Sequence, residues 1–228
     1  MLKNKHIFKY QIWHLLSLGS LLFLLTAYIS QNPSILTGSY YNISANTWFW
    51  LAIAEPIIHQ TYVMLVWRFE LYQRTFSKRW GIKKAFKFYT IGFSILFVSR
   101  LISIILLSIS TQYTLNITPI IAYTTAAIIT PLVIYLFYSV KKYFTIERAY
   151  GIDHFDPNYH QPYVKQGIFK YTDNGMYVFG LMILYLPGLL LFSKAALLAA
   201  LFNHIYIWVH FYCTEKPDML KIYGKVGS

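Results

Sequence analysis

Residues 175–213 read GMYVFGLMILYLPGLLLFSKAALLAALFNHIYIWVHFYC and contain a single Lys, Arg, Asp or Glu residue, Lys194. A helix that crosses a bilayer needs about 20 mostly apolar residues. The stretch is long enough for two such helices, and Ser193 and Lys194 interrupt it near the middle. We therefore expect a tight helical hairpin, which either crosses the membrane fully or forms a short re-entrant pair.

Four more apolar runs precede this hairpin, at about 11–29, 47–68, 88–109 and 118–140. Hydrophobic residues make up 57% of the chain and charged residues 12%, whereas soluble domains carry about 25% charged residues. We predict an all-α, polytopic membrane protein with about six transmembrane helices. Because no loop is long enough for another domain, we expect one membrane domain.

The lysine and arginine residues alternate between the expected loops. They are absent from 30–46 and 110–117, whereas seven lie in 68–87 and five in 141–174. Three more precede the first run, and three follow the last. Basic residues are enriched in cytoplasmic loops. This pattern predicts that both termini and the 141–174 segment are cytoplasmic.

The net charge of +12 could suggest a nucleic-acid partner. The basic residues flank apolar runs, however, and no soluble domain offers a basic face, so we expect no nucleic acid. The single cysteine, Cys213, cannot form an internal disulfide or a cysteine-based metal cluster, and we expect no metal.

Acidic residues gather in the C-terminal part. Gly151, Pro157, Pro162 and Gly167 disfavour a continuous helix over 147–174. An ordered loop of that length in a compact protein is usually functional. We expect this segment to be the working part; the alternative is that loops simply hold the polar residues. Six of the eight acids follow residue 146, namely Glu147, Asp153, Asp156, Asp173, Glu215 and Asp218.

Several polar residues fall inside the expected spans. Helical periodicity places His204 and Glu215 on nearly the same face, and Asn203 and His210 on another. In the second span Glu55 and His59 are four residues apart, with Pro56 between them, and Arg100 lies in the third. Such groups are costly in a membrane and face a cavity or a partner. Each is therefore either a site residue or a buried structural group.

Three motifs appear in order in the C-terminal half: YGIDHF at 150–155, GIFKYTDNGMYVFG at 167–180 and TEKPDMLKIYG at 214–224. Their order and spacing resemble those of the membrane phospholipid N-methyltransferases, which are related to the isoprenylcysteine carboxyl methyltransferases. The third motif resembles the ending of phosphatidylethanolamine methyltransferases. The resemblance covers roughly 130–224. It implies N-terminal spans in 1–117 and a methyltransferase-like core in 118–228, with a cytoplasmic segment at 141–174 and a terminal hairpin at 175–213.

The resemblance implies methyl transfer from S-adenosylmethionine to the amine of phosphatidylethanolamine, towards phosphatidylcholine, at the cytoplasmic face. A proton must leave that amine, and the candidate catalytic bases are Asp153, His154 and Asp173. The implied donor-binding residues are Tyr150, Gly151, Gly175, Tyr177, Gly180, His204, Glu215 and Lys216. The implied lipid-binding residues are Tyr163, Tyr171, Asn174 and Tyr223.

The chain departs from the family pattern at two places. Many relatives have Arg-His-Pro where this chain has Asp173-Asn174-Gly175, which favours a phosphatidylethanolamine-type member. Many also have two adjacent glutamates in the tail, and here the second is Lys216. Glu215 is therefore the safer donor ligand of the two.

Three alternatives stay open at this point. The acceptor could be another lipid-like molecule, as in the isoprenylcysteine type. The chain could be a membrane reductase of the sterol type, which shares the terminal hairpin. It could also be a transporter or scaffold without enzymatic activity, using Glu55, His59 and Arg100. In each case the expected partner is the bilayer of a bacterial inner membrane or an endoplasmic reticulum.

Overall fold

The computed structural model describes residues 4–159 and 161–224. Five helices of these residues are long and apolar enough to cross a membrane. Four are α2 (Gln11–Gln31), α3 (Ala45–Gln73), α5 (Ile82–Ser110) and α6 (Pro119–Ser139), which continues as the π-helical turn η2 (Val140–Phe144). The fifth consists of α10 (Lys194–His210), the π-helical turn η6 (Phe211–Glu215) and α11 (Lys216–Tyr223). The predicted all-α, polytopic architecture is confirmed.

The remaining apolar run, at 175–190, is short and broken. It consists of α8 (Gly175–Phe179), the 3-10 turn η5 (Gly180–Leu184) and α9 (Tyr185–Leu190). These 16 residues span roughly 25 Å, less than the roughly 30 Å of a hydrocarbon core. After α9 the chain turns at Phe192, with φ of 53°, and the Ser193 side chain caps α10. This turn makes the expected hairpin.

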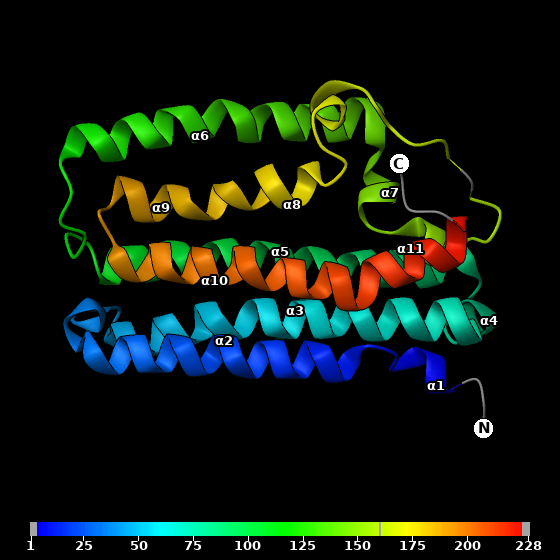
Figure 1. Cartoon of the computed structure of the whole chain (residues 1–228), viewed down its shortest axis with the longest axis horizontal. Coiled ribbons are helices and arrows are strands. Elements are labelled where there is room, and N and C mark those ends of the chain that lie inside the picture. Colours follow the sequence, from blue (N-terminus) through cyan, green and yellow to red (C-terminus); the bar gives the residue numbers. More distant parts are fainter. Residues whose placement is uncertain (1–3, 160, 225–228) are drawn as a thin grey trace.

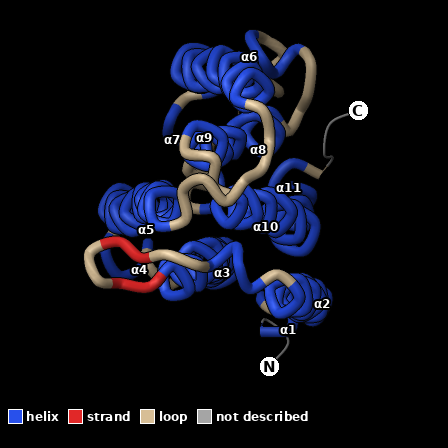
Figure 2. Tube along the Cα trace, turned by 90° about the vertical axis from the view of Figure 1, so that its left-hand side faces the viewer, coloured by secondary structure: helices blue, strands red, loops and turns tan. Residues whose placement is uncertain are grey.

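Helix α10 lies at the centre of the bundle. It contacts α2, α3, α5 and α9, and α6 covers the far side of α9 (Figures 1 and 2). Four alanines of α10 are fully buried, and such small residues let helices approach closely in a membrane. They are Ala195, Ala196, Ala199 and Ala200. Large apolar side chains such as Phe23 of α2 and Ile120 of α6 are exposed on the outside.

The short elements gather at the two ends of the bundle. At one end lie α1 (Asn4–Ile7), α4 (Ser77–Trp80), α7 (Ile146–Ala149) and α11 (Figure 1). The 3-10 turns η3 (Ile152–His154) and η4 (Gly167–Lys170) belong to the segment that follows α7. The other end has the 3-10 turn η1 (Pro33–Leu36) and the antiparallel strands β1 (Ser39–Tyr40) and β2 (Ile43–Ser44), with Ser39 paired to Ser44 and Tyr40 to Ile43 (Figure 2).

The basic loops therefore lie together at the end that carries α4, α7 and α11 (Figure 1). The uncharged 30–46 loop lies at the opposite end, with the tip of the hairpin. This arrangement agrees with the charge alternation of the sequence. The side of the membrane that each end faces stays a prediction.

A proline inside a helix frees a carbonyl oxygen, because proline has no backbone N–H. The long helices contain Pro56, Pro131 and Pro217 in their interiors, and for Pro56 and Pro217 a neighbouring helix supplies the missing donor. Pro56 leaves the carbonyl of Ala52 in α3 without its helical donor, and the Asn203 amide of α10 donates to that oxygen at 3.4 Å. Pro217 frees the carbonyl of Cys213 in the same way, four residues earlier. Side chains of other helices take up both oxygens, as backbone groups in a membrane require.

We expect Ala199→Leu to destabilise the protein by about 1–3 kcal/mol, because the added side chain has no space in the centre of the bundle. Thermal unfolding of the purified protein in detergent measures this. Ala127→Leu is the matched control, since Ala127 is exposed on α6. Equal midpoints for Ala199→Leu and the control would contradict the packing described above.

Candidate functional site

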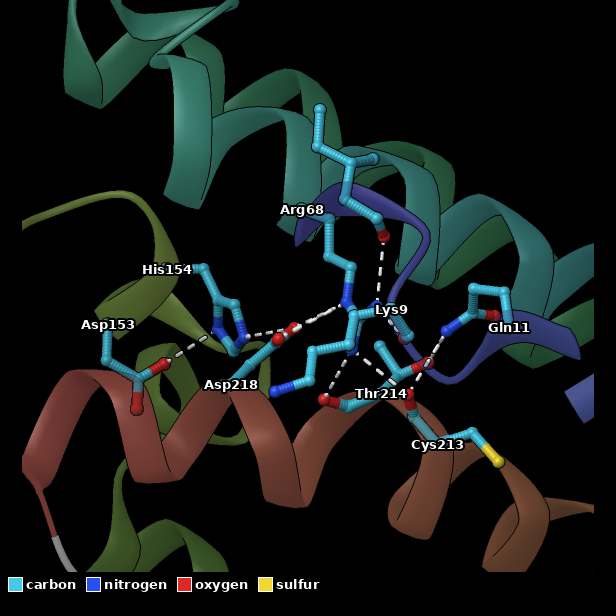
Figure 3. A network of polar contacts seen from close by, with 9 residues as sticks. Lys9, Gln11, Arg68, Asp153, His154, Cys213, Thr214 and Asp218 are labelled. Carbon is cyan, nitrogen blue, oxygen red and sulfur yellow. Dashed lines mark hydrogen bonds and ion pairs between the residues drawn. The ribbon is translucent and has the colours of Figure 1, made fainter. Parts of the chain in front are cut away.

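Arg68, near the end of α3, anchors the site end of the bundle. Its side chain is buried, and its Nε lies 3.2 Å from the Asp218 carboxylate of α11 (Figure 3). Its two terminal nitrogens donate to four backbone carbonyls. These oxygens belong to Ile7 at 2.9 Å, Lys9 at 2.6 Å, Cys213 at 3.0 Å and Thr214 at 3.4 Å. One side chain thereby joins the N-terminal segment, α3 and the turn before α11.

Gln11 at the start of α2 reinforces this junction. Its amide nitrogen donates to the Cys213 carbonyl at 3.1 Å and to the Thr214 hydroxyl at 3.2 Å (Figure 3). The Cys213 oxygen that Pro217 frees therefore accepts two hydrogen bonds from outside its helix. This double contact fixes the turn η6 in place.

His154 of η3 lies between two carboxylates. Its Nδ1 is 3.1 Å from Asp153 and its Nε2 is 3.8 Å from Asp218 (Figure 3). The Tyr223 hydroxyl of α11 donates to the other Asp153 oxygen at 3.0 Å. These contacts hold η3, from the segment after α7, against α11.

In this group the positive charges of Arg68 and His154 are balanced by the negative charges of Asp153 and Asp218. Burial alone would lower the pKa of His154, but the Asp153 and Asp218 carboxylates outweigh it and raise the pKa to about 9. Burial would likewise raise the pKa of Asp153, but hydrogen bonds from His154 and Tyr223 lower it below its usual value. His154 is therefore a cation at neutral pH and Asp153 an anion.

Glu215 ends the turn η6, beside this group. The charged side chains nearest to it are those of His154, Asp153 and Asp218. The carboxylate oxygen Oε2 is buried and has no hydrogen-bond partner among the described residues. A buried polar atom left unpaired costs about 1–3 kcal/mol. The carboxylate is therefore free to receive a cation or a hydroxyl group from a ligand.

The π-helical turn η6 changes which residues accompany Glu215. An uninterrupted α-helix would place His204 within about 20° of Glu215. The wider turn rotates Glu215 away from that position, and the His204 ring lies instead against Tyr185 of α9, 5.8 Å between centroids. The structure does not bring His204 to the Glu215 group. His210, directly before the turn, is buried instead, and both its ring nitrogens are unpaired within the described part of the chain.

Gly151 brings the 147–174 segment against α3. Its φ is 80°, and an added Cβ would come within 2.5 Å of the Trp67 indole. The His154 ring also stacks on Trp67, with 4.0 Å between the ring centroids. The position therefore requires glycine for both its backbone angle and its close approach. Gly175 and Gly180 approach side chains of Phe169 and Leu136 less closely.

The other predicted donor-binding residues are more dispersed. The Tyr150 hydroxyl lies 2.8 Å from Ser94 of α5, and the Tyr177 ring packs on Trp208 and Phe211 of the last helix. Lys216 is exposed, with its ammonium above the Tyr212 ring. Tyr150 thus lies near Gly151, whereas Lys216 points to the surface.

Four of the predicted residues lie at or near the surface of the segment between α7 and α8. Tyr163, Tyr171 and Asp173 are exposed, and Asn174 precedes α8 without capping it through its side chain. Burial and the Asp173 carboxylate raise the pKa of Tyr163. Tyr163 therefore lies near Asp173, whereas the Tyr171 side chain is largely exposed.

A second polar group lies deeper, between α3 and α5. His59 Nδ1 is 3.1 Å from the Arg100 guanidinium, and Ser99 donates to Glu55. The expected pairing of these residues is thus internal, between neighbouring helices. No group of three His, Cys, Asp or Glu side chains among residues 4–159 and 161–224 is arranged to hold a metal ion.

Residues 117–226 match the sequence model of the phospholipid methyltransferases. This part of the chain belongs to the phospholipid methyltransferase family. The phospholipid methyltransferase domain begins just before α6 and includes the 147–174 segment, the hairpin, Glu215 and Asp218. Searches among curated proteins and among solved structures returned no match. Arg68 and Trp67 of α3 lie outside the matched domain and contact its residues Asp218 and His154.

We expect the ion pairs of His154 to make stability depend on pH. The folded pKa of about 9 exceeds the ordinary 6.5, so the stabilisation is complete below pH 6.5 and is lost as the pH rises through 9. The loss is on the order of 3 kcal/mol. Melting temperatures between pH 6 and 10 measure it. His154→Gln should flatten this slope, whereas replacement of the exposed His6 by Gln should not. A slope retained in His154→Gln would contradict the assignment.

Gly151→Ala should lower the melting temperature and change the tryptophan fluorescence, because the new Cβ would collide with Trp67. Gly224→Ala is the matched control, since Gly224 has a φ of 74° but no atom within 4 Å of an added Cβ. The control carries the backbone strain without the collision. A similar loss in both variants would show that the contact with Trp67 does not matter.

Proposed function

We propose that the protein is an S-adenosylmethionine-dependent enzyme that methylates the amine headgroup of phosphatidylethanolamine, towards phosphatidylcholine, at the cytoplasmic face of its membrane. Membership of the phospholipid methyltransferase family supports the reaction class. The observation that carries the proposal is the unpaired, buried carboxylate oxygen of Glu215 within the matched domain. The charge pattern supports the cytoplasmic side.

The residues around Glu215 fit such a donor. S-adenosylmethionine, when bound, supplies a methyl group on a positively charged sulfur, and it also carries an ammonium and ribose hydroxyls. Glu215 would accept hydrogen bonds from the ammonium or the ribose. Gly151 would let the 147–174 segment pack directly against Trp67 and so keep His154 in place beside Glu215. Tyr150 and Gly175 would line the same side.

The predicted residues at the surface of the segment between α7 and α8 would position the lipid. Tyr163 and Asp173 are exposed, and Asn174 directly precedes α8. A headgroup entering from the membrane surface would meet these residues, and the Asp173 carboxylate would attract its ammonium. Orientation of the reacting groups supplies much of the rate in a direct displacement. We assign Asp173 to this attraction.

Asp153 and His154 would have a supporting role. Each is already engaged by a neighbour, His154 by two carboxylates and Asp153 by His154 and Tyr223. A group held in ion pairs is a poor acceptor for another proton. We infer that they hold α11, and with it Glu215, against the 147–174 segment. The N-terminal spans would be part of the working unit, because Arg68 and Trp67 come from α3.

Expression in a host without phosphatidylcholine, followed by lipid mass spectrometry, tests the activity. We expect mono-, di- or trimethylated headgroups. Vesicles with labelled donor and phosphatidylethanolamine give the rate in vitro. A labelled isoprenylcysteine instead of a labelled phospholipid would reassign the acceptor, and no labelled product at all would overturn the proposal.

Glu215→Gln should weaken donor binding by about tenfold to a hundredfold, which corresponds to about 1.5–3 kcal/mol for a hydrogen bond to a charged group. Equilibrium dialysis with labelled donor measures this. Lys216→Gln is the control, because Lys216 is the adjacent, exposed residue of the same motif. Unchanged binding in Glu215→Gln would remove Glu215 from the donor site.

A further inference from the structure

His210 is the buried side chain that the described contacts leave most incomplete. It is 2% exposed, and neither ring nitrogen has a hydrogen-bond partner within residues 4–159 and 161–224. His14 of α2 is buried nearby, with 6.2 Å between the ring centroids, and both its nitrogens are paired, to Gln11 and Tyr206. The two neighbouring histidines thus differ in their hydrogen bonding: both ring nitrogens of His14 are paired, whereas neither ring nitrogen of His210 is paired within the described residues.

The surroundings of His210 contain further unpaired polar atoms. The Trp67 ring of α3 lies 6.1 Å from the His210 ring. The Trp67 indole nitrogen and the hydroxyl of Tyr89 are buried beside each other, and neither makes a geometrically complete hydrogen bond to a described residue. Three helices, α3, α5 and α10, thus bring incompletely bonded polar atoms close together, and His210 has two of them. Unsatisfied groups cost several kcal/mol each in a membrane interior, and a bound polar ligand would offset that cost.

The turn η6 relates His210 to Glu215. In an α-helix, residues five apart point about 140° away from each other. The turn η6 lies between these two residues, and its i→i+5 hydrogen bond, from the Lys216 N–H to the Phe211 carbonyl, widens the helix and reduces that angle. His210 and Glu215 are thereby brought towards a common side, with Trp67 against His210 and His154.

The charged and titratable groups that face His210 are His14 from α2, His59 and Arg68 from α3, and His154 from η3. Arg68 is neutralised by Asp218, and His154 lies between Asp153 and Asp218. His14 and His59 are engaged by Tyr206 and Arg100. Among these groups His210 alone has both ring nitrogens unpaired within the described residues. A neutral imidazole always carries one lone pair, whichever tautomer is present.

We propose that His210 is the base that takes the proton from the lipid ammonium; this rests on the function proposed above. An N–H bond of the ammonium breaks, its electron pair stays on nitrogen, and the proton goes to the imidazole. The neutral amine then forms a bond to the methyl carbon of the sulfonium donor, and the carbon–sulfur electron pair passes to sulfur. The imidazolium returns its proton to water when the methylated lipid has left.

The test compares His210→Gln with His14→Gln in vesicles that contain phosphatidylethanolamine. We expect His210→Gln to bind labelled donor within about threefold of wild type, because Glu215 is intact. Its kcat should fall by about 10²–10⁴, the contribution of a positioned base. Its rate should also rise about tenfold per pH unit up to the pKa of the lipid amine, since the rate then follows the neutral amine in solution. His14→Gln should lower the melting temperature and leave the pH profile of wild type.

A second variant guards against misfolding. His210→Ala removes both unpaired nitrogens, and imidazole added to the buffer should restore part of its rate. Wild-type kcat and pH profile in His210→Gln would overturn the role of His210 while leaving the proposed function intact. Loss of donor binding equal to that of Glu215→Gln would also overturn it, because His210 would then be a donor ligand. Absence of methylated lipid with the wild type would overturn the proposed function, and the base with it.

Discussion

The buried guanidinium of Arg68 is the interaction on which the site end of the molecule depends. Arginine has five N–H donors and no acceptor, and Arg68 directs its nitrogens to one carboxylate and four backbone carbonyls. Taking such a charge out of water costs several kcal/mol unless its geometry and hydrogen bonds are complete. The hydrogen bonds of Arg68 are complete only because the N-terminal segment, at Ile7 and Lys9, and the turn η6, at Cys213 and Thr214, both meet α3.

Pro217 explains why the carbonyls that Arg68 needs are available. In a regular helix the Cys213 oxygen would accept from the N–H of residue 217, and proline has none. The freed oxygen attracts Arg68 and Gln11, and the chain widens into the π-helical turn just before it. The same proline thus supplies the acceptor for the anchor and changes the direction of Glu215. Deeper in the bundle Pro56 likewise frees the carbonyl oxygen of Ala52, and the Asn203 side chain donates a hydrogen bond to it.

The sequence predicted the elements of the fold well, since hydropathy and charge act locally along the chain. The apolar runs became helices, and the segments with basic residues came to one end (Figure 1). It also pointed to Asp153, His154 and Glu215, which the structure brings together. It could not predict Arg68, which looked like one more basic residue at the end of a span. Its acid partner is 150 residues away, and no local pattern reports so distant a pairing.

The same limit explains His204 and His210. A helical wheel assumes a constant angle per residue, and the η6 turn breaks that assumption between residues 211 and 215. His204 then lies against α9 and His210 faces Trp67. Pro217 is the signal that could have indicated this change, because proline often interrupts the hydrogen-bond ladder of a helix.

The unpaired buried atoms give the site its physical character. Trp67, Tyr89, His210 and Glu215 come from α3, α5 and the last helix, and each has a buried polar atom without a geometrically complete hydrogen bond within the described residues. Packing could have filled these positions with apolar side chains at lower cost, as the alanines of α10 do at its other end. The phospholipid methyltransferase domain supplies His210 and Glu215, whereas Trp67 and Tyr89 precede it. A ligand that paired these atoms would contact both parts of the chain, and under the proposed function the N-terminal helices would be part of the site rather than a membrane anchor for it.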